Sequence, residues 1–311
     1  MPARSILQLI DRSVAVVTLQ TRFWERSWKH RAGRLGVHGL YGYLGILLLL
    51  LSLEDWLLYH PGTAEDWAPP PRGVPVEDVK LTSCDGCRVH AWWAAPPGWG
   101  PGQGAVLLCH GNAGNLSYRG CYLCDWLEEM KVGVLLFDYP GFGRSTGRPS
   151  EASCYAAGDA AYDYLTGVRQ VPGERVVLYG GSLGGGIATD LAGRRPHRAL
   201  VLVSTFTSFP DMAQKQYPWL PGRWLVHNRF ENLRKISGCR GPVFIAHGTR
   251  DGLIPISQAE RLFAAAPEPK RFFPMLDHGH NDALTPPGFR ALRQFLEEVE
   301  RGGRQTASAE R

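Results

Sequence analysis

Short apolar runs alternate with longer segments of helical periodicity over residues 89–299, and this alternation is the main structural signal in the chain. Apolar runs of about five residues predict buried strands, while apolar positions three or four residues apart predict helices. The expected strands are 89–94, 105–109, 132–138, 175–179, 199–204, 243–246 and 271–275. The expected helices are 116–130, 151–165, 182–192, 256–266 and 289–299. This pattern predicts an α/β domain with a mostly parallel sheet that is covered by helices on both faces.

The longest apolar run comes earlier, at residues 39–53, and contains no charged residue. Counted from Gly36 to Leu53, it reaches the roughly 17 residues that a membrane-spanning helix needs at minimum. With the apolar residues that follow Asp55, we predict a hydrophobic anchor at 36–59. A buried or interfacial helix and the core of a signal peptide are the alternatives. Against cleavage, no Ala-x-Ala-like site follows closely and the charged leader is long.

Much of the excess positive charge lies in a basic leader at residues 1–35, within a chain of net charge +5. Acidic Glu54 and Asp55 follow the apolar run. Because basic flanks stay on the cytoplasmic side of a membrane, we expect a single-pass protein with a cytoplasmic N-terminus. The remaining basic residues form no stripe along the chain, so the sequence gives little support for nucleic-acid binding.

Proline marks the boundary between the apolar run and the rest of the chain. Residues 60–75 are rich in proline and predict a linker, too broken for a helix or a central strand. With 44% hydrophobic and 20% charged residues, the body of the chain has the composition of a globular domain. We expect one large domain at 76–303 and a polar tail at 304–311.

The seven cysteines include two Cys-x-x-Cys pairs, Cys84/Cys87 and Cys121/Cys124. Two such pairs could bind zinc. The first pair lies in an apparent hairpin turn, where a disulfide is also conceivable. The second pair falls on one face of an expected helix, where cysteine often packs as a small apolar residue. We expect no metal, and the zinc site and the disulfide stay open as alternatives.

The sharpest chemical signal is the segment Gly180-Gly-Ser-Leu-Gly184, between an expected strand and an expected helix. Gly-x-Ser-x-Gly in this context is typical of a nucleophile elbow. The outer glycines leave room in a strained turn where larger side chains would collide. Ser182 would also stand at a helix N-terminus, where backbone N–H groups favour developing negative charge. We predict Ser182 as the nucleophile, and a glycine-rich turn with a capping serine is the alternative.

A second segment, 110–115 (HGNAGN), follows an expected strand. Backbone N–H groups of such a loop stabilise an oxyanion because they point at the charge before it forms. We predict Leu183, the residue after the nucleophile, as one donor and Asn112 as the other, with Ala113 as the alternative to Asn112. His110 is a possible base, but we expect its ring to brace the loop.

Candidates for an acid and a base follow later in the chain. Asp251 comes just after the expected strand 243–246, and functional side chains gather at this edge of open α/β sheets. An Asp-Gly turn is the alternative. His278 and His280 follow the last expected strand, and either could be the base. We expect Asp282 to cap the next helix.

Together these segments resemble the membrane-anchored α/β-hydrolase-domain serine hydrolases, a family with eukaryotic protein depalmitoylases, lysophospholipid lipases and many bacterial members. The likeness covers residues 36–300. The matching segments are 110–115, 138–151, 180–186, 205–211, 247–251 and 279–282.

The resemblance implies an α/β-hydrolase fold, with an eight-stranded, mostly parallel sheet and a small cap. The order Ser182, Asp251, His280 is that of α/β-hydrolases. In this family the base is the histidine of a Gly-His-Asn-Asp segment, which here is His280. The implied reaction is acyl transfer through a covalent intermediate on Ser182, with Asp251 orienting the histidine. No cofactor is required.

Residues 205–235 lie between two expected strands and are rich in aromatic residues. We expect them to form the cap, with Phe206, Tyr217, Trp219 and Trp224 lining an apolar substrate pocket. The alternative is that these rings only pack the cap onto the domain. The expected partners are a membrane and a small-molecule or lipid-like acyl substrate, an ester or thioester before a peptide or amide. A non-catalytic, membrane-anchored binding module is the rival hypothesis.

Overall fold

The structure, a computed structural model, describes residues 28, 30–219 and 221–309, with 302–309 as backbone only. The chain forms two compact units, residues 1–54 and 55–311. Most of the basic leader predicted at 1–35 lies outside the described residues.

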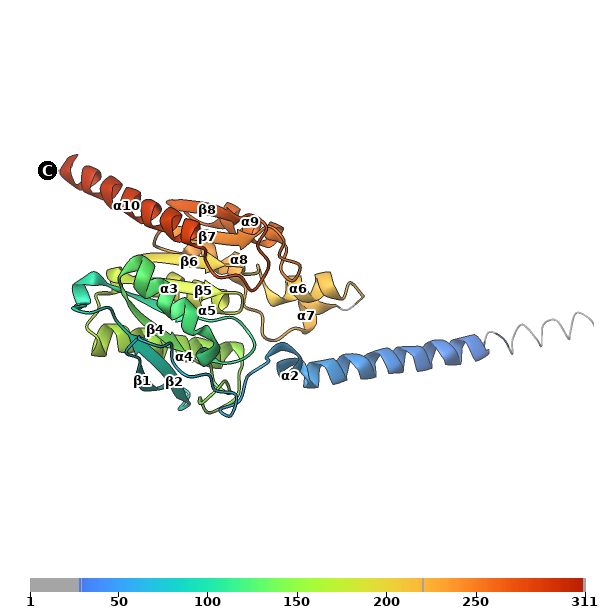
Figure 1. The fold of residues 1–311 in the computed structure, drawn as a ribbon. Coiled ribbons are helices and arrows are strands. Elements are labelled where there is room, and N and C mark those ends of the chain that lie inside the picture. The colour runs from blue at the N-terminus through green and yellow to red at the C-terminus, as the bar shows by residue number, and fades with distance from the viewer. Residues whose placement is uncertain (1–27, 29, 220, 310–311) are drawn as a thin grey trace, which may run out of the picture. The chain divides into compact units, whose positions relative to one another are not determined.

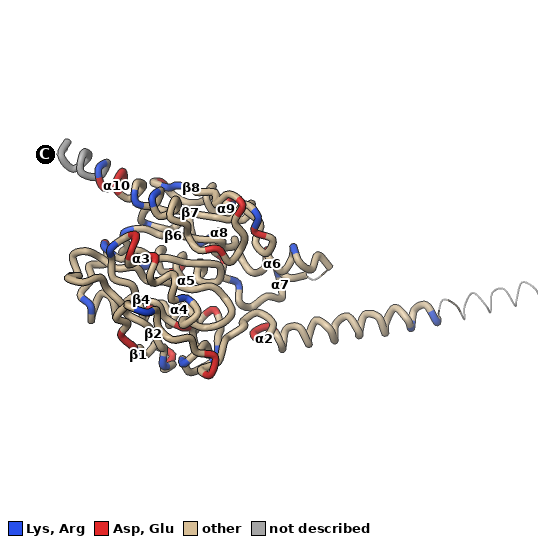
Figure 2. Tube along the Cα trace, viewed as in Figure 1, with Lys and Arg blue, Asp and Glu red and all other residues tan. Residues whose placement is uncertain are grey.

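The first unit contains the helix His30–Ser52, which is 23 residues long. The most apolar stretch of 18 residues in this helix has a mean hydropathy of 1.7. By length and composition this helix could cross a membrane. In its described part, charged side chains are confined to the start, at Arg31 and Arg34 (Figure 2). The helix begins earlier and ends earlier than the anchor predicted at 36–59, because the chain turns at Leu53 and a separate short helix follows, α2 (Glu54–Leu58).

The second unit is built on an eight-stranded sheet with the strand order β1-β2-β4-β3-β5-β6-β7-β8 (Figure 1). The strand β2 is antiparallel to β1 and β4, and the pairs from β4 to β8 are parallel. This confirms the predicted mostly parallel, eight-stranded sheet. The strands are β1 (Glu77–Thr82), β2 (Arg88–Ala94), β3 (Ala105–Cys109), β4 (Gly133–Phe137), β5 (Val176–Gly181), β6 (Ala199–Val203), β7 (Val243–Gly248) and β8 (Lys270–Met275).

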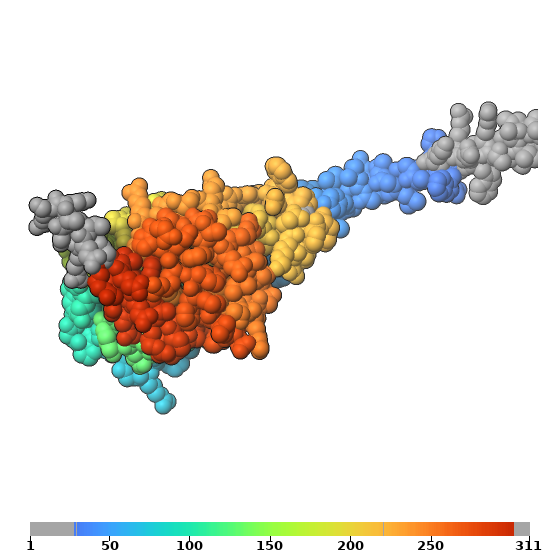
Figure 3. All heavy atoms as spheres, turned by 90° about the horizontal axis from the view of Figure 1, so that it is seen from above, coloured from blue at the N-terminus to red at the C-terminus, as the bar shows by residue number. Residues whose placement is uncertain are grey.

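Helices cover both faces of this sheet, as predicted. One face packs against α3 (Gly120–Met130) and α10 (Pro286–Ala309), and Leu108 of β3 points to this face. The other face packs against α4, α5 and α9, and the neighbouring Leu107 points there. The bounds of these three helices are Glu151–Asp163, Gly184–Arg194 and Ile256–Ala265. Figure 3 shows α10 and the other C-terminal elements, orange to red, on the outer surface of this unit.

Some elements differ from the sequence-based expectation. The edge strand β1 has no apolar run because only two of its positions are buried. The expected helix 116–130 begins with a 3₁₀ turn, Leu116–Arg119, and the helix 151–165 continues as a π turn, Tyr164–Val168. The backbone of α10 extends to Ala309, through most of the predicted polar tail. The predicted cap, 205–235, contains α6 (Phe209–Gln216), α7 (Gly222–Leu225) and α8 (Asn232–Lys235).

The proline-rich segment 60–75 contains no helix or strand, but it belongs to the second unit and packs against β2. The ring of Trp67 lies edge-on to His90 and Trp92, at 5.1 and 5.6 Å between centroids. The guanidinium of Arg144 lies 4.0 Å from the centroid of the same ring. The segment predicted as a linker is therefore part of the folded unit.

Candidate active site

The candidate nucleophile Ser182 occupies a sharp turn between β5 and α5. Its φ is +49°, a conformation that non-glycine residues rarely adopt. Its backbone N–H donates to Val203 O at 3.0 Å. A Cβ on Gly180 would lie 2.6 Å from Gly184 O, and a Cβ on Gly184 would lie 2.0 Å from Cys109 O. The two outer glycines are therefore required by close backbone contacts, as expected for a nucleophile elbow.

We predict that Gly184→Ala destabilises the protein by about 3 kcal/mol, because the new methyl group would collide with the backbone of β3. The matched control is Gly193→Ala in the same helix, where a Cβ would meet no atom within 4 Å. That substitution should stabilise the helix by up to about 1 kcal/mol. Urea unfolding followed by circular dichroism measures both effects, and equal stabilities of the two variants would contradict the prediction.

The structure brings Ser182, His280 and Asp251 together, although they lie far apart in the sequence. His280 Nε2 lies 3.0 Å from Ser182 Oγ, and His280 Nδ1 lies 2.8 Å from Asp251 Oδ2. Each residue follows a strand of the parallel sheet, β5, β8 and β7 respectively, so all three meet at its carboxyl edge. This geometry allows His280 to remove the serine proton while the carboxylate holds the imidazole in one tautomer.

The carboxylate of Asp251 is fully buried but has many partners. Its Oδ1 accepts from the backbone N–H groups of Leu253 and Ile254, at 2.9 and 2.7 Å. Its Oδ2 lies 3.3 Å from His247 Nε2, which also donates to Ile254 O at 2.7 Å. Burial raises the pKa of Asp251, but the hydrogen bonds from His247, His280 and Ile254 outweigh burial, and the pKa lies well below its usual value. Asp251 is therefore ionised at neutral pH.

We predict that Asp251→Asn lowers kcat about 10⁴-fold, because an amide at this place favours the wrong imidazole tautomer. The same substitution should change how stability depends on pH. Asp251 has a lower pKa in the folded than in the unfolded chain, so the stability it contributes is present above about pH 4 and is lost as the pH falls. Urea unfolding between pH 2 and 7 should therefore show a smaller loss for the variant than for the wild type.

The control for this substitution is Asp277→Asn, at an exposed carboxylate that pairs with Arg250 on the surface. This variant should keep the activity and the pH dependence of the wild type. An equal loss of stability between pH 7 and pH 2 in the wild type and in Asp251→Asn would contradict the predicted role of the buried carboxylate.

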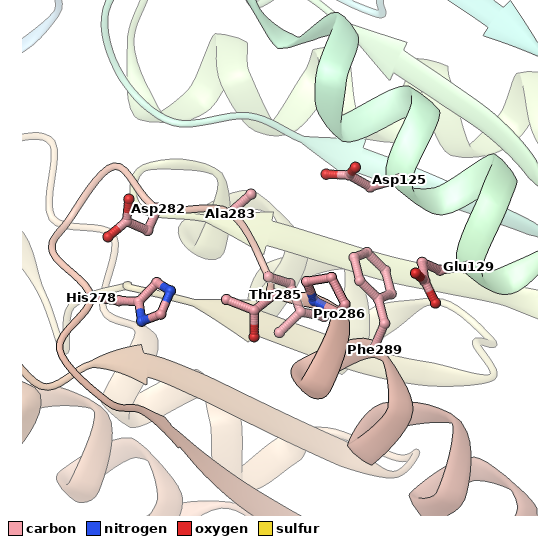
Figure 4. Close-up of a pocket in the computed structure, with 9 residues that line it drawn as sticks. Asp125, Glu129, His278, Asp282, Ala283, Thr285, Pro286 and Phe289 are labelled. Atoms are coloured by element: carbon pink, nitrogen blue, oxygen red, sulfur yellow. The ribbon is translucent and has the colours of Figure 1, made fainter.

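The competing histidine, His278, lies in a different place. Its Nδ1 donates to Leu276 O at 2.6 Å, and its ring lines a separate cavity of about 260 Å³ (Figure 4). That cavity lies between α3 and the start of α10, and its lining does not include Ser182. Asp282, expected to cap the next helix, instead accepts from Gly279 N at 2.7 Å. The capping prediction is wrong, because Thr285 Oγ1 accepts from the first turn of α10.

The loop after β3 runs beside the nucleophile. A Cβ on Gly111 would lie 3.4 Å from Ser182 Cβ, which shows how closely the loop approaches. In the described part of the chain, the backbone N–H groups of Asn112 and Leu183 donate to no protein acceptor. His110 stacks on Tyr139 at 4.4 Å between ring centroids, and its Nδ1 donates to Gly111 O at 2.7 Å, so its ring braces the loop.

A cavity of about 380 Å³ opens beside Ser182 and His280. Part of its wall is apolar, and another part is polar. The apolar residues are Leu108, Tyr179, Val203 and Leu253, and the polar ones include His60, Arg119, Tyr122 and Asn281. Sequence reasoning assigned none of these residues to the pocket. They come from separate segments, and only Asn281 lies in a segment that the sequence analysis singled out, 279–282.

The structure does not bring the four predicted substrate-binding rings to this cavity. Phe206 is buried and stacks on Phe209 at 4.4 Å between centroids. Tyr217, Trp219 and Trp224 are exposed, at 50%, 57% and 88% of their surface. The physical reason is that the cavity is lined by other segments: none of the described residues of 205–235 lies in its wall.

The cysteine pairs lie on different elements. Cys84 and Cys87 flank the turn between β1 and β2, while Cys121 and Cys124 lie on α3. All seven cysteines are free thiols, so the structure contains no Cys84–Cys87 disulfide. Among the described residues, no group of three or more His, Cys, Asp or Glu side chains could hold a metal ion.

Comparisons with known proteins agree with this architecture. Residues 104–225 match the family model of the alpha/beta hydrolase fold. The chain is 38% identical over 262 residues to the uncharacterized protein Rv2307c of Mycobacterium tuberculosis, covering 82% of this chain and 91% of the relative. It is 30% identical over 290 residues to the alpha/beta hydrolase domain-containing protein WAV2 of Arabidopsis thaliana, covering 83% and 93%.

Among solved structures, an acetyl xylan esterase from Paenibacillus sp. R4 superposes with a TM-score of 0.60 at 23% identity, covering 74% of this chain and 85% of that chain. A likeness at this identity extends to the fold. The elbow at Ser182, the strand order and the two similar sequences lead to the same conclusion: this chain belongs to the α/β-hydrolase family.

Proposed function

We propose that this protein is a serine hydrolase that cleaves acyl esters or thioesters through an acyl-enzyme intermediate. The observation that carries the proposal is the hydrogen-bonded chain from Ser182 through His280 to Asp251, at 3.0 and 2.8 Å, beside a cavity. A serine is a weak nucleophile at neutral pH and needs an adjacent base, and the base needs a third group to orient it. Ser182, His280 and Asp251 supply the nucleophile, the base and the orienting group, and His280 lies at hydrogen-bonding distance from both of the others.

In the first half of the reaction, Ser182 Oγ attacks the acyl carbonyl while His280 Nε2 takes the hydroxyl proton. The carbonyl becomes a tetrahedral oxyanion, which the N–H groups of Leu183 and Asn112 bind. The protonated His280 then gives its proton to the leaving alcohol or thiol, and the acyl group stays on the serine. Ionised Asp251 stabilises the imidazolium that forms between the two proton transfers.

In the second half, water enters and His280 removes its proton as the water oxygen attacks the acyl-enzyme. The oxyanion forms and collapses again, the acid leaves, and Ser182 recovers its proton. In this scheme His280 accepts or donates the proton in every transfer.

An apolar acyl group is the substrate that best fits the cavity. Leu108, Val203 and Leu253 contribute apolar surface beside the nucleophile, and the volume of about 380 Å³ is within the range of small-molecule pockets. The exposed rings of Tyr217, Trp219 and Trp224 do not line this cavity. The substrate class is therefore an ester or thioester with a lipid-like or other apolar acyl chain.

The test is hydrolysis of p-nitrophenyl esters with acyl chains from two to sixteen carbons by the purified full chain. We expect turnover, with an initial burst of p-nitrophenol that approaches the enzyme concentration for esters whose deacylation is slower than their acylation. Turnover of anilides but not of esters would favour an amidase or peptidase of the same fold. No turnover of either class would favour the non-catalytic binding module.

We also propose that the helix His30–Ser52 anchors the protein in a membrane, with a cytoplasmic N-terminus. The support is its length, its mean hydropathy of 1.7 and the basic residues that precede the apolar run. After carbonate washing, the full chain should stay in the membrane pellet and leave it only with detergent. Release into the supernatant by carbonate alone would reject the anchor.

A further inference from the structure

A short segment that begins at the last residue of α2 pairs with the loop that carries the proposed oxyanion donor. We call residues 58–63 the strap. Gly62 N donates to Gly114 O at 2.7 Å, and Gly114 N donates to His60 O at 3.1 Å. These two bonds flank a parallel β-bridge between Pro61 and Gly114. The strap therefore holds the loop as a neighbouring strand would hold it.

The side chain of Asn112 binds the same segment. Its Nδ2 donates to Leu58 O at 2.6 Å, and its Oδ1 accepts from His60 N at 3.2 Å. The side-chain amide of Asn112 thus donates one hydrogen bond to the strap backbone and accepts one from it, at Leu58 and His60, as a backbone peptide group would. The residue proposed to bind the oxyanion through its backbone N–H is fixed by its side chain.

The loop needs such support because its backbone is strained. Ala113 has a φ of +69° and Gly114 a φ of +70°. A non-glycine residue in this region costs about 1–3 kcal/mol and persists only where the surroundings hold it. Arg119 Nη2 donates to Ala113 O at 3.1 Å from within the cavity wall, and the strap bonds the residues on either side of Ala113.

The strap is itself fixed at both ends. The ring of Tyr59 is buried, and its hydroxyl donates to Asn228 Oδ1 at 2.9 Å. Gly62 O accepts from Gly143 N at 2.8 Å. The contact with the loop is also close, since a Cβ on Gly62 would lie 3.0 Å from the Cα and carbonyl carbon of Gly114.

We propose that the strap is a positioning element for the oxyanion hole: by bonding Asn112 and Gly114, it keeps the Asn112 N–H aimed at the developing oxyanion. The proposal rests on the proposed function, since an oxyanion hole matters only for acyl transfer. Residues of the strap do not react with substrate; they act through the loop. The activity of the hydrolase unit therefore depends on the segment that directly follows α2, outside the sequence motifs of the site.

Two single substitutions weaken the contact from opposite sides. Gly62→Ala places a methyl group against the backbone of Gly114, and Asn112→Ala removes the side-chain amide while keeping the backbone N–H. Complete loss of an oxyanion donor costs about 10²–10³-fold in kcat, so a displaced donor should cost about 10-fold. The control is Gly102→Ala, where a Cβ would meet no atom within 4 Å.

The experiment compares the purified full chain and these variants with a short p-nitrophenyl ester. We expect kcat to fall about 10-fold in Gly62→Ala and Asn112→Ala, with KM and the pH profile of kcat unchanged, because His280 is not disturbed. The affinity for a trifluoromethyl ketone, whose adduct with Ser182 carries an oxyanion, should fall by the same factor. The kcat of the double variant should be no lower than that of the less active single variant, since both changes break the same contact.

A purely structural strap would give the opposite pattern: lower unfolding midpoints but wild-type kcat and ketone affinity in the folded variants. That result would overturn the proposal and leave the proposed function intact. If Gly62→Ala does not fold, Asn112→Ala decides, because it only removes a half-buried side chain. Wild-type turnover that survives Ser182→Ala would instead remove the proposed function and the strap's role with it.

Discussion

Ser182→Ala is expected to lower kcat for a short p-nitrophenyl ester by about 10⁶-fold, as when the nucleophile of a comparable triad is removed. The reason is that, in the proposed mechanism, the hydroxyl 3.0 Å from His280 Nε2 forms the covalent bond to the acyl group, and alanine has no atom to replace it. Residual hydrolysis should come only from binding and from the oxyanion donors. Initial rates at saturating ester measure the effect.

A fluorescent fluorophosphonate probe gives a second measurement that does not depend on the choice of substrate. It should label the wild type and leave Ser182→Ala unlabelled. The control is Ser237→Ala, because Ser237 lies exposed on the surface and its hydroxyl donates to the nearby Arg234 O. Labelling of Ser182→Ala at the wild-type rate would show that another residue is the nucleophile.

His280→Ala should lower kcat by a similar factor, about 10⁶-fold, because the triad acts as one unit and loses its function with either member. Without the imidazole, the serine proton has no acceptor and the leaving group has no donor. The measurement is the same ester assay, together with the rate of fluorophosphonate labelling, which should fall as well.

The neighbouring histidine is the matched control for this experiment. His278→Ala should keep at least most of the wild-type kcat, since its ring bonds Leu276 O and lines the cavity that excludes Ser182. The reverse result, with an active His280→Ala and an inactive His278→Ala, would show that His278 and not His280 is the base. Circular dichroism of both variants separates a loss of chemistry from a loss of fold.

The order of strands and helices could be predicted because burial leaves a local record in the sequence. The strands β3, β4 and β6 are buried on both faces and appear as continuous apolar runs. The edge strand β1 was missed because it has only two buried apolar positions, Val79 and Leu81, which are too few to stand out as an alternating pattern. The helices α6 to α8 were missed because short helices contain too few turns for a clear period. Periodicity therefore found the centre of the sheet better than its edge.

The turn that carries the candidate nucleophile could also be predicted, because a strained turn demands particular residues at fixed spacing. Backbone contacts at Gly180 and Gly184 exclude any Cβ, and the motif is readable without the fold. The base was different. His278 and His280 are neighbours in the sequence with equivalent local contexts, and the resemblance to a family favoured His280. The distances to Ser182 and Asp251 now separate the two histidines by geometry.

The sequence by itself determined the sheet-and-helix architecture, the elbow at Ser182 and the candidates Asp251 and His280, since each depends on nearby residues. Only the tertiary structure decided which side chains line the cavity, where the aromatic rings of 205–235 point, and that the proline-rich segment packs on the oxyanion loop. These features arise from contacts between distant segments, such as His60 with Asn112, which are 52 residues apart. No pattern within either segment records such a pairing, because it exists only after the chain between them has folded.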